Sequence, residues 1–124
     1  MSSLAPWLTV RDGRAALAFY EAAFGAEVVY RLADPGAGVV ARLGIGGAEL
    51  WVSDGAPAAE GPEAVGGGTV RMILTVADPD AAFARALKAG ASEVFPVGEG
   101  HGWRLGRLVD PFGLHWEIGR PPAE

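Results

Sequence analysis

Apolar and polar positions along the chain follow two different periods. Short apolar runs in which alternate residues are polar are typical of half-buried strands, and apolar residues spaced by three and four are typical of a helix. Strands are predicted at 6–10, 27–32, 39–45, 48–53, 70–76, 93–97, 104–109 and 114–119. Helices are predicted at 13–24 and from 79 to the glycine at 90. The pattern therefore predicts an α+β fold with many short elements.

The ends of both predicted helices carry residues that favour a boundary. Asp12 and Asp78 stand immediately before the helices, where a carboxylate can accept a free backbone N–H. Pro79 suits the first helical position, because the N–H that proline lacks has no partner there. Gly25 and Gly90 follow the last apolar turn of each helix, as residues at the C′ position often do.

The two helical regions belong to an internal repeat. The stretch from Leu8 to Val29 resembles the stretch from Leu74 to Phe95, and both begin with the pattern LTV-x-D-x-x-AA. A repeat with copies this far apart is too long for a solenoid and fits two copies of one βαβββ unit. We expect one domain over 1–124, with a first module at about 5–54, a linker at about 55–68 and a second module at about 69–119.

Composition narrows the possible chemistry. The chain has no cysteine and only two histidines, so thiolate zinc sites, cysteine nucleophiles and His-rich metal sites are excluded. A net charge of −5 argues against nucleic acid as a partner. No apolar run is long enough to span a membrane, and the sequence opens without the pattern of a secretory signal. We expect a cytoplasmic protein that does not act on a membrane.

Strand alternation places several functional candidates on common faces. Glu49 shares a face with Trp51, and His115 shares a face with Glu117. Glu49, His115 and Glu117 could form a carboxylate–histidine triad for a divalent metal. They could instead form a hydrogen-bonded network in a polar cavity, or His115 and Glu117 could serve acid–base catalysis without a metal. No nucleophile or oxyanion arrangement is recognisable.

The four tryptophans are the second group of candidates. Trp116 is expected in the core, on the helix-facing side of its strand, whereas Trp51 could line a cavity or pack inside the protein. Trp7 carries the same two alternatives. Trp103 and His101 lie in a glycine-rich approach to a strand and are candidates for a cavity mouth or a dimer contact. Aromatic walls suit flat ligands, which stack on them and bury apolar surface.

Together these motifs resemble a known superfamily. The residues that carry the resemblance are LTVRD with FYEAAFGAE, GGAELWVSD, LTVADPDAAFARALKAGA and DPFGLHWEI, and they cover nearly the whole chain. The chain resembles the vicinal oxygen chelate superfamily of glyoxalase I, extradiol dioxygenases, fosfomycin-resistance enzymes and bleomycin-resistance proteins. It looks most similar to the small bacterial glyoxalase/bleomycin-resistance-like branch.

The resemblance implies an architecture and a site. Tandem βαβββ modules would form a curled mixed sheet around a ligand cavity, and the protein would be a homodimer. Metal-dependent members place ligands on the first and fourth strands of each module, which implies Ala5, Glu49, Arg71 and Glu117 here. Alanine has no donor atom and arginine is a fixed cation, so the usual four-ligand site is broken.

Two roles for Arg71 follow from that comparison. We infer that its guanidinium takes the place of the metal charge and pairs with Glu49, Glu117 or both. Alternatively, it binds an anionic group of a substrate, because arginine suits bidentate recognition of carboxylate or phosphate. We therefore expect no metal or other cofactor; a divalent metal, if one binds, would use Glu49, His115 and Glu117.

Two classes of function follow. The first is a protein that binds or sequesters a bulky small molecule, such as an antibiotic or natural product, in an aromatic and acidic cavity. The expected ligand-binding residues are Trp7, Glu49, Trp51, Arg71, His101, Trp103, His115 and Glu117. The second is a lyase, isomerase or dioxygenase-type enzyme with a nonstandard metal site or metal-free acid–base chemistry. A third possibility is an inactive relative with a regulatory or unknown ligand.

Overall fold

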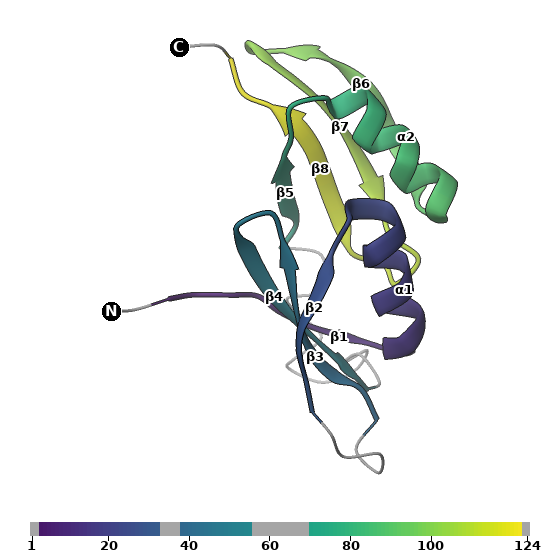
Figure 1. Ribbon diagram of the computed structural model, residues 1–124. Coiled ribbons are helices and arrows are strands. Elements are labelled where there is room, and N and C mark those ends of the chain that lie inside the picture. The colour runs from purple at the N-terminus through teal and green to yellow at the C-terminus, as the bar shows by residue number, and fades with distance from the viewer. Residues whose placement is uncertain (1–2, 33–37, 56–69, 123–124) are drawn as a thin grey trace. The chain divides into compact units, whose positions relative to one another are not determined.

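The computed structural model describes residues 3–32, 38–55 and 70–122 (Figure 1). The chain divides into two compact units, residues 1–64 and 65–124, and each is described by itself. Apart from Gly55, the predicted linker at 55–68 lies outside the described residues. None of the helices in the described ranges is long and apolar enough to cross a membrane.

The first unit is a four-stranded sheet with one helix. Its elements are β1 (Trp7–Val10), α1 (Gly13–Phe24), β2 (Glu27–Arg31), β3 (Val40–Ile45) and β4 (Ala48–Asp54). The strands lie in the order β1-β4-β3-β2, with β1 parallel to β4 and the other neighbours antiparallel. Parallel neighbours need a long connection, which α1 and the two strands after it supply.

The second unit repeats this plan. Its elements are β5 (Met72–Thr75), α2 (Pro79–Ala89), β6 (Ser92–Gly100), β7 (Trp103–Val109) and β8 (His115–Arg120). The strand order is β5-β8-β7-β6, with β5 parallel to β8. The predicted α+β class with two βαβββ modules is confirmed: the described residues form eight strands in two mixed sheets and two helices.

Both helices begin and end at the predicted residues. The Asp12 carboxylate accepts the backbone N–H of Ala15 at 3.0 Å, and the Asp78 carboxylate accepts that of Ala81 at 3.1 Å. Gly25 ends α1 in the left-handed region, with φ of 68°. A side chain would be strained in that conformation. The local cap chemistry therefore fixes both helix lengths.

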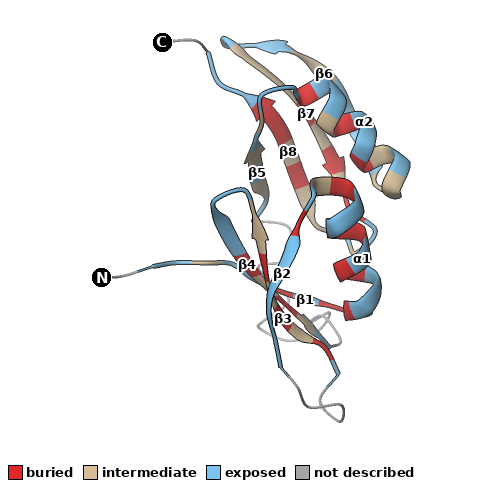
Figure 2. Cartoon of the chain, viewed as in Figure 1, coloured by how far each residue is buried: buried red, intermediate tan, exposed pale blue. Residues whose placement is uncertain are grey.

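Each unit has its own apolar core between the helix and one face of the sheet (Figure 2). In the first unit the buried residues include Leu17 and Tyr20 of α1, together with Leu8, Val10, Ala41, Leu43, Leu50 and Val52 of the strands. In the second they include Phe83 and Ala86 of α2, together with Leu108, Trp116 and Ile118 of the strands. Trp116 lies in the core, as predicted. The opposite, helix-free face of each sheet is left for other contacts.

Strand pairing gives the repeat a residue-level register. A row of paired positions across the first sheet runs Trp7, Trp51, Arg42 and Tyr30. The corresponding row across the second sheet runs Ile73, Glu117, Arg107 and Phe95. In both units the last member of the row follows a shift of register, between Val28 and Tyr30 in β2 and between Glu93 and Phe95 in β6. The rows are equivalent in place and different in chemistry.

Asp54, at the end of β4, connects three parts of the first unit. Its carboxylate accepts the backbone N–H of Val39 at 2.6 Å and that of Gly13, the first residue of α1, at 2.5 Å. These two hydrogen bonds, with Val39 the larger effect, hold the pKa of the Asp54 carboxyl below its ordinary value of 3.8. The ionised form therefore fixes the start of α1 against β4.

We expect this contact to make stability depend on pH. A carboxyl whose pKa is lower in the folded chain stabilises the fold above its unfolded value, and that stability is lost as pH falls below about 4. Asp54→Asn should lower the free energy of unfolding by about 1 kcal/mol at pH 7, because the site is exposed and screened. Urea denaturation of both proteins should show the difference shrinking as pH falls. Glu27→Gln removes the same charge without removing a backbone acceptor, so an equal loss there would contradict the prediction.

Candidate functional site

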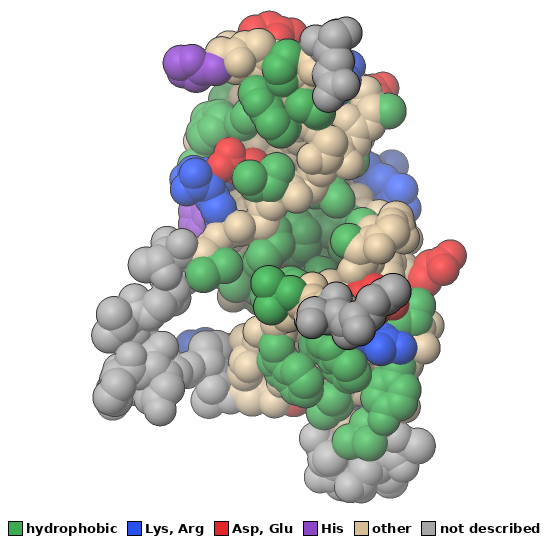
Figure 3. Space-filling view, turned by 90° about the vertical axis from the view of Figure 1, so that its left-hand side faces the viewer, with side chains coloured by type: hydrophobic (Ala, Val, Ile, Leu, Met, Phe, Trp, Pro, Cys, Tyr) green, Lys and Arg blue, Asp and Glu red, His purple; other side chains and the backbone are tan. Residues whose placement is uncertain are grey.

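An aromatic row lies on the helix-free face of the first unit. The rings of Trp7 and Trp51 stack with centroids 5.3 Å apart and planes 10° apart. Tyr30 meets Trp51 edge-on at 5.8 Å. Trp7 is 54% exposed and Tyr30 is 44% exposed, although both are large and apolar. Hydrophobic side chains gather on the surface of this unit in the lower half of Figure 3.

Polar contacts hold this aromatic row in place. The indole Nε1–H of Trp7 donates to the Ser53 hydroxyl at 2.9 Å. The Arg42 guanidinium carbon lies 5.5 Å from the centre of the Trp51 ring, which is within the range of a cation–π contact. Arg42 also forms an ion pair with Glu49, with Nε and Oε1 3.7 Å apart. Trp51 is therefore fixed between a second indole and a cation, and Glu49 supplies the counter-charge.

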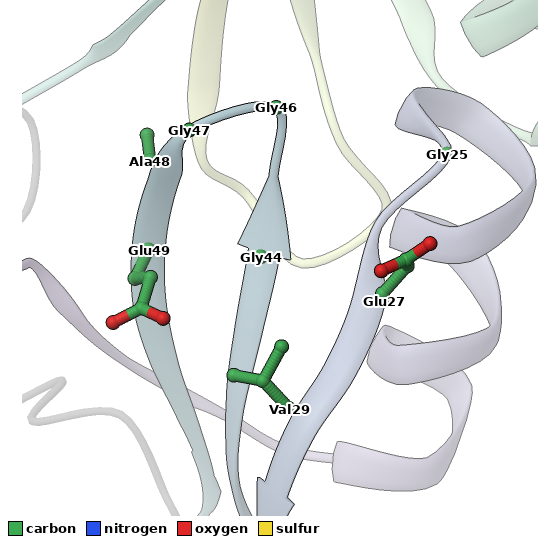
Figure 4. A pocket seen from close by; sticks show the side chains of 8 residues that line it. All are labelled: Gly25, Glu27, Val29, Gly44, Gly46, Gly47, Ala48 and Glu49. Atoms are coloured by element: carbon green, nitrogen blue, oxygen red, sulfur yellow. The ribbon is translucent and has the colours of Figure 1, made fainter.

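A pocket of about 280 Å³ lies beside the aromatic row (Figure 4). Its floor is Gly44 of β3, which pairs with Glu27 of β2 on one side and Glu49 of β4 on the other. Because Gly44 has no side chain, the two carboxylates and Val29 surround a hollow. This end of the face is acidic and would favour a cationic group.

In the second unit, Glu117 of β8 lies between two arginines. Arg71 donates its Nε–H to Oε1 of Glu117 at 2.5 Å. Nη2 of Arg107 is 3.7 Å from the same oxygen. The Glu117 side chain is only 12% exposed. The predicted pairing of Arg71 with Glu117 is confirmed, and Arg107 is a further cation that the sequence patterns did not indicate.

Apolar pockets adjoin this charged cluster. One of about 170 Å³ includes Ile73, Trp103 and Leu105 with Glu117, and another of about 350 Å³ includes Phe95 and Leu105. His101 lines both. It occupies the turn between β6 and β7 with φ of 53°. That backbone conformation costs energy for a residue other than glycine.

The register corrects one position that the resemblance implied. In the first sheet Glu49 pairs with Gly44 and lies two residues before Trp51. The residue that lies two positions before Glu117 is His115, so the counterpart of Glu49 in the second unit is His115 and not Glu117. The counterpart of Glu117 is Trp51. Counting alternate positions on a strand identifies the correct face, but both Glu49 and Trp51 satisfy it. Pairing with the neighbouring strands is needed to choose between them.

The residues present do not fit the metal site that the resemblance implies. Ala5 offers no donor, Trp51 occupies the place equivalent to Glu117, and the Arg71 guanidinium already binds the Glu117 carboxylate. The Arg71 guanidinium lies at hydrogen-bond distance from the Glu117 carboxylate, so it would repel a divalent ion placed there. Across residues 3–32, 38–55 and 70–122, no three His, Asp or Glu side chains form a group suited to a metal. Of the proposed triad, Glu49 belongs to the first unit, and His115 and Glu117 belong to the second.

Sequence reasoning missed four members of the two equivalent rows: Tyr30, Arg42, Phe95 and Arg107. Each lies on a strand that the sequence predicts. For Tyr30 and Phe95, the register shifts in β2 and β6 change which residue reaches the helix-free face. A signal for the arginines was present, since Arg-Leu recurs as Arg42-Leu43 and Arg107-Leu108. The two arginines, like Gly25 and Gly90, are spaced one residue more closely than Leu8 and Leu74, at which the repeat begins.

The comparisons with known proteins agree with this fold. A family model described as a glyoxalase-like domain matches residues 7–119. An uncharacterised protein of Mycobacterium bovis is 39% identical over 98% of this chain and 85% of its own length. Crystal structures of TioX from Micromonospora and of a manganese-bound fosfomycin-resistance protein, FosX, from Listeria monocytogenes are similar. TioX is 30% identical, with a TM-score of 0.73 over 96% of this chain and 98% of its own. FosX is 19% identical, with a TM-score of 0.75 over 100% of this chain and 94% of its own, and shows the fold alone.

Proposed function

We propose, from the premise that the chain belongs to the glyoxalase-like domain family of the vicinal oxygen chelate superfamily, that it binds and sequesters a bulky, partly aromatic small molecule. An antibiotic or another natural product is the expected kind of ligand. The proposal includes no metal and no chemical change of the ligand. We also propose that the protein is a homodimer, as the superfamily resemblance implies, and that it is cytoplasmic.

The stacked pair of Trp7 and Trp51 is the observation that carries this proposal. Two parallel indoles on a sheet face bury each other only in part, since Trp7 stays more than half exposed. Exposed aromatic surface of this kind is costly in water and is found where a ligand or partner covers it. A flat aromatic ligand would continue the stack on the exposed ring of Trp7.

Charge supports a ligand with a cationic group. Glu49 and Glu27 flank the hollow over Gly44, next to Trp51. The chain as a whole has a net charge of −5, which raises the local concentration of cations. Arg42 adds one positive charge beside Trp51, but its ion pair with Glu49 offsets part of it.

We expect Trp51→Leu to weaken binding of proflavine, a flat aromatic cation, about tenfold, because the variant removes the central ring of the stack. Isothermal titration calorimetry on the full chain measures this without depending on tryptophan emission. Phe112→Leu is the matched control: it removes a half-buried aromatic ring from the turn between β7 and β8 in the second unit and should change the affinity less than twofold. Equal losses in the two variants would show that the aromatic row is not the binding surface.

The same purified protein can separate sequestration from catalysis. A panel of bleomycin-like and enediyne-like compounds tests binding, and a small dicarbonyl such as methylglyoxal tests turnover. Saturable binding of a panel compound, which is recovered unchanged, supports sequestration. Consumption of the dicarbonyl that is lost in Glu117→Gln or His115→Gln would contradict it and would support the lyase, isomerase or dioxygenase alternative.

A further inference from the structure

We propose that Arg71 and Arg107, arranged around Glu117 on the helix-free face of the second unit, form a binding subsite for the carboxylate of an apolar small molecule. The aromatic row of the first unit plays no part in this inference, and the two proposals can fail separately. The subsite is built from β5, β7 and β8 and the residue that precedes β5.

The charges in this cluster do not balance. Two guanidiniums, those of Arg71 and Arg107, face the Glu117 carboxylate. Only the Arg71 guanidinium donates a hydrogen bond to it. Arg107 approaches no closer than 3.7 Å, which is beyond hydrogen-bond length. Among the residues that the structure describes, one positive charge of this cluster is therefore left without a counter-charge, beside a carboxylate that is nearly buried.

The donors in the cluster are also incompletely used. Arg71 gives its Nε–H to Glu117, and its terminal amino groups make no hydrogen bond to the described residues, although the side chain is 53% exposed. Nε of Arg107 and Nδ1 of His115 are buried and have no hydrogen-bond partner within the described part of the chain. Buried polar atoms without partners are rare in folded proteins. The hydrogen-bonding groups of the cluster are therefore not all satisfied by the described residues.

The geometry of Arg107 favours a planar anion. Its guanidinium carbon lies 5.7 Å from the centre of the Phe95 ring, so the aromatic face supports it from β6. A guanidinium held in one orientation presents parallel N–H groups that match the two oxygens of a carboxylate. A flat acid can therefore bind between the exposed edges of Arg71 and Arg107 without displacing Glu117, which keeps both cations in place.

The surface beside the cluster indicates the chemical character of the rest of the ligand. The pocket of about 170 Å³ that includes Glu117 is otherwise lined by Ile73, Trp103 and Leu105, together with His101 and Gly100. Ile73 is paired with Glu117 in the sheet and is largely exposed. A small apolar body attached to the carboxylate would cover this surface. The ligand class is therefore a small aromatic or aliphatic acid.

Titration of the full chain with 3-phenylpropionate tests the proposal, with the uncharged 3-phenylpropanamide as the matched ligand. Nuclear magnetic resonance shifts give the affinity and show which residues respond. We expect the acid to bind about tenfold more tightly than the amide, and Arg71→Gln and Arg107→Gln each to lose about that factor. Arg85→Gln, on α2, removes the same charge from the same unit and should change the affinity less than twofold.

Several outcomes would overturn the subsite. These are equal affinity for the acid and the amide, an equal loss in Arg85→Gln, or no saturable shift with the acid. If Arg107→Gln does not fold, as circular dichroism would show, Arg107→Lys keeps the charge but not the planar fork and should still lose several-fold affinity. Trp51→Leu should leave phenylpropionate binding unchanged while it weakens proflavine binding, which separates this proposal from the first.

Discussion

Replacing Asp110 by alanine is expected to lower the free energy of unfolding by about 3 kcal/mol. Asp110 is 4% exposed and stands in the turn between β7 and β8. One carboxylate oxygen accepts the backbone N–H groups of Phe112 at 2.9 Å and Leu114 at 3.0 Å. The other accepts the indole N–H of the core residue Trp116 at 2.9 Å. Alanine would leave all three donors without this acceptor, at the end of β8 from which Glu117 extends.

Two further variants separate the contributions of the turn and the indole. Asp110→Asn keeps one carbonyl oxygen for the turn and places an amide N–H₂ against the Trp116 indole, so it should lose less than alanine. Trp116→Phe removes the donor. A double-mutant cycle of Asp110→Asn and Trp116→Phe, measured by urea denaturation, should give a coupling free energy of about 1 kcal/mol. A loss in Asp110→Ala of under about 1 kcal/mol would show that the carboxylate does not hold this turn.

Gly106→Ala is expected to cost about 2 kcal/mol, because a methyl group at this position has no room. An added Cβ would lie 2.8 Å from the backbone nitrogen of Val97, 3.0 Å from the Phe83 ring and 3.0 Å from the backbone carbon of Pro96. Two of those atoms belong to the backbone of β6, at the second shift of its register, between Phe95 and Gly98. The clash would therefore move the strand that carries Phe95, and the support of Arg107 would weaken.

Gly98→Ala is the matched control for this prediction. Gly98 lies on the neighbouring strand β6, and an added Cβ there would meet nothing within 4 Å. Neither glycine has a positive φ, so backbone strain does not separate the two variants. We expect thermal unfolding to show a clear fall in melting temperature for Gly106→Ala alone. Equal changes in both would mean that loss of glycine flexibility, and not the clash, sets the effect.

The sequence was sufficient for those parts of the fold whose cause is local. Asp12 and Gly25 set the two ends of α1, because the Asp12 carboxylate accepts a nearby backbone N–H and Gly25 adopts a left-handed conformation. The repeat that begins at Leu8 and again at Leu74 is confirmed by register, since Trp7 and Ile73 occupy equivalent places. Strand β6 runs to Gly100, beyond the predicted 93–97, because it continues to pair with β7 up to the turn at His101.

The candidate site was less predictable because it depends on pairing between strands. Alternation grouped Trp51 with Glu49 and Glu117 with His115, but it left open whether Trp51 lines a cavity or packs inside the protein. It also could not show that Trp51 and Glu117 are equivalent positions. Arg42 and Arg107 could be identified as members of the site only from the pairing of their strands with β4 and β8. The contacts that form the site, such as the 3.7 Å approach of Arg107 to Glu117, join residues on different strands. Such contacts produce no periodic pattern in the sequence.

The register shift in β2 has a consequence for the behaviour of the protein in concentrated solution. β2 forms one edge of the first sheet, and it exposes the apolar residues Val28, Val29 and Tyr30 (Figure 2). A flat edge of this composition would invite a strand of another molecule to pair with it and begin aggregation. The irregularity between Val28 and Tyr30 interrupts the regular row of backbone groups, and the charged Glu27 and Arg31 stand at its two ends. The same shift that turns Tyr30 toward Trp51 therefore also makes this edge a poor template for pairing with a strand of another molecule.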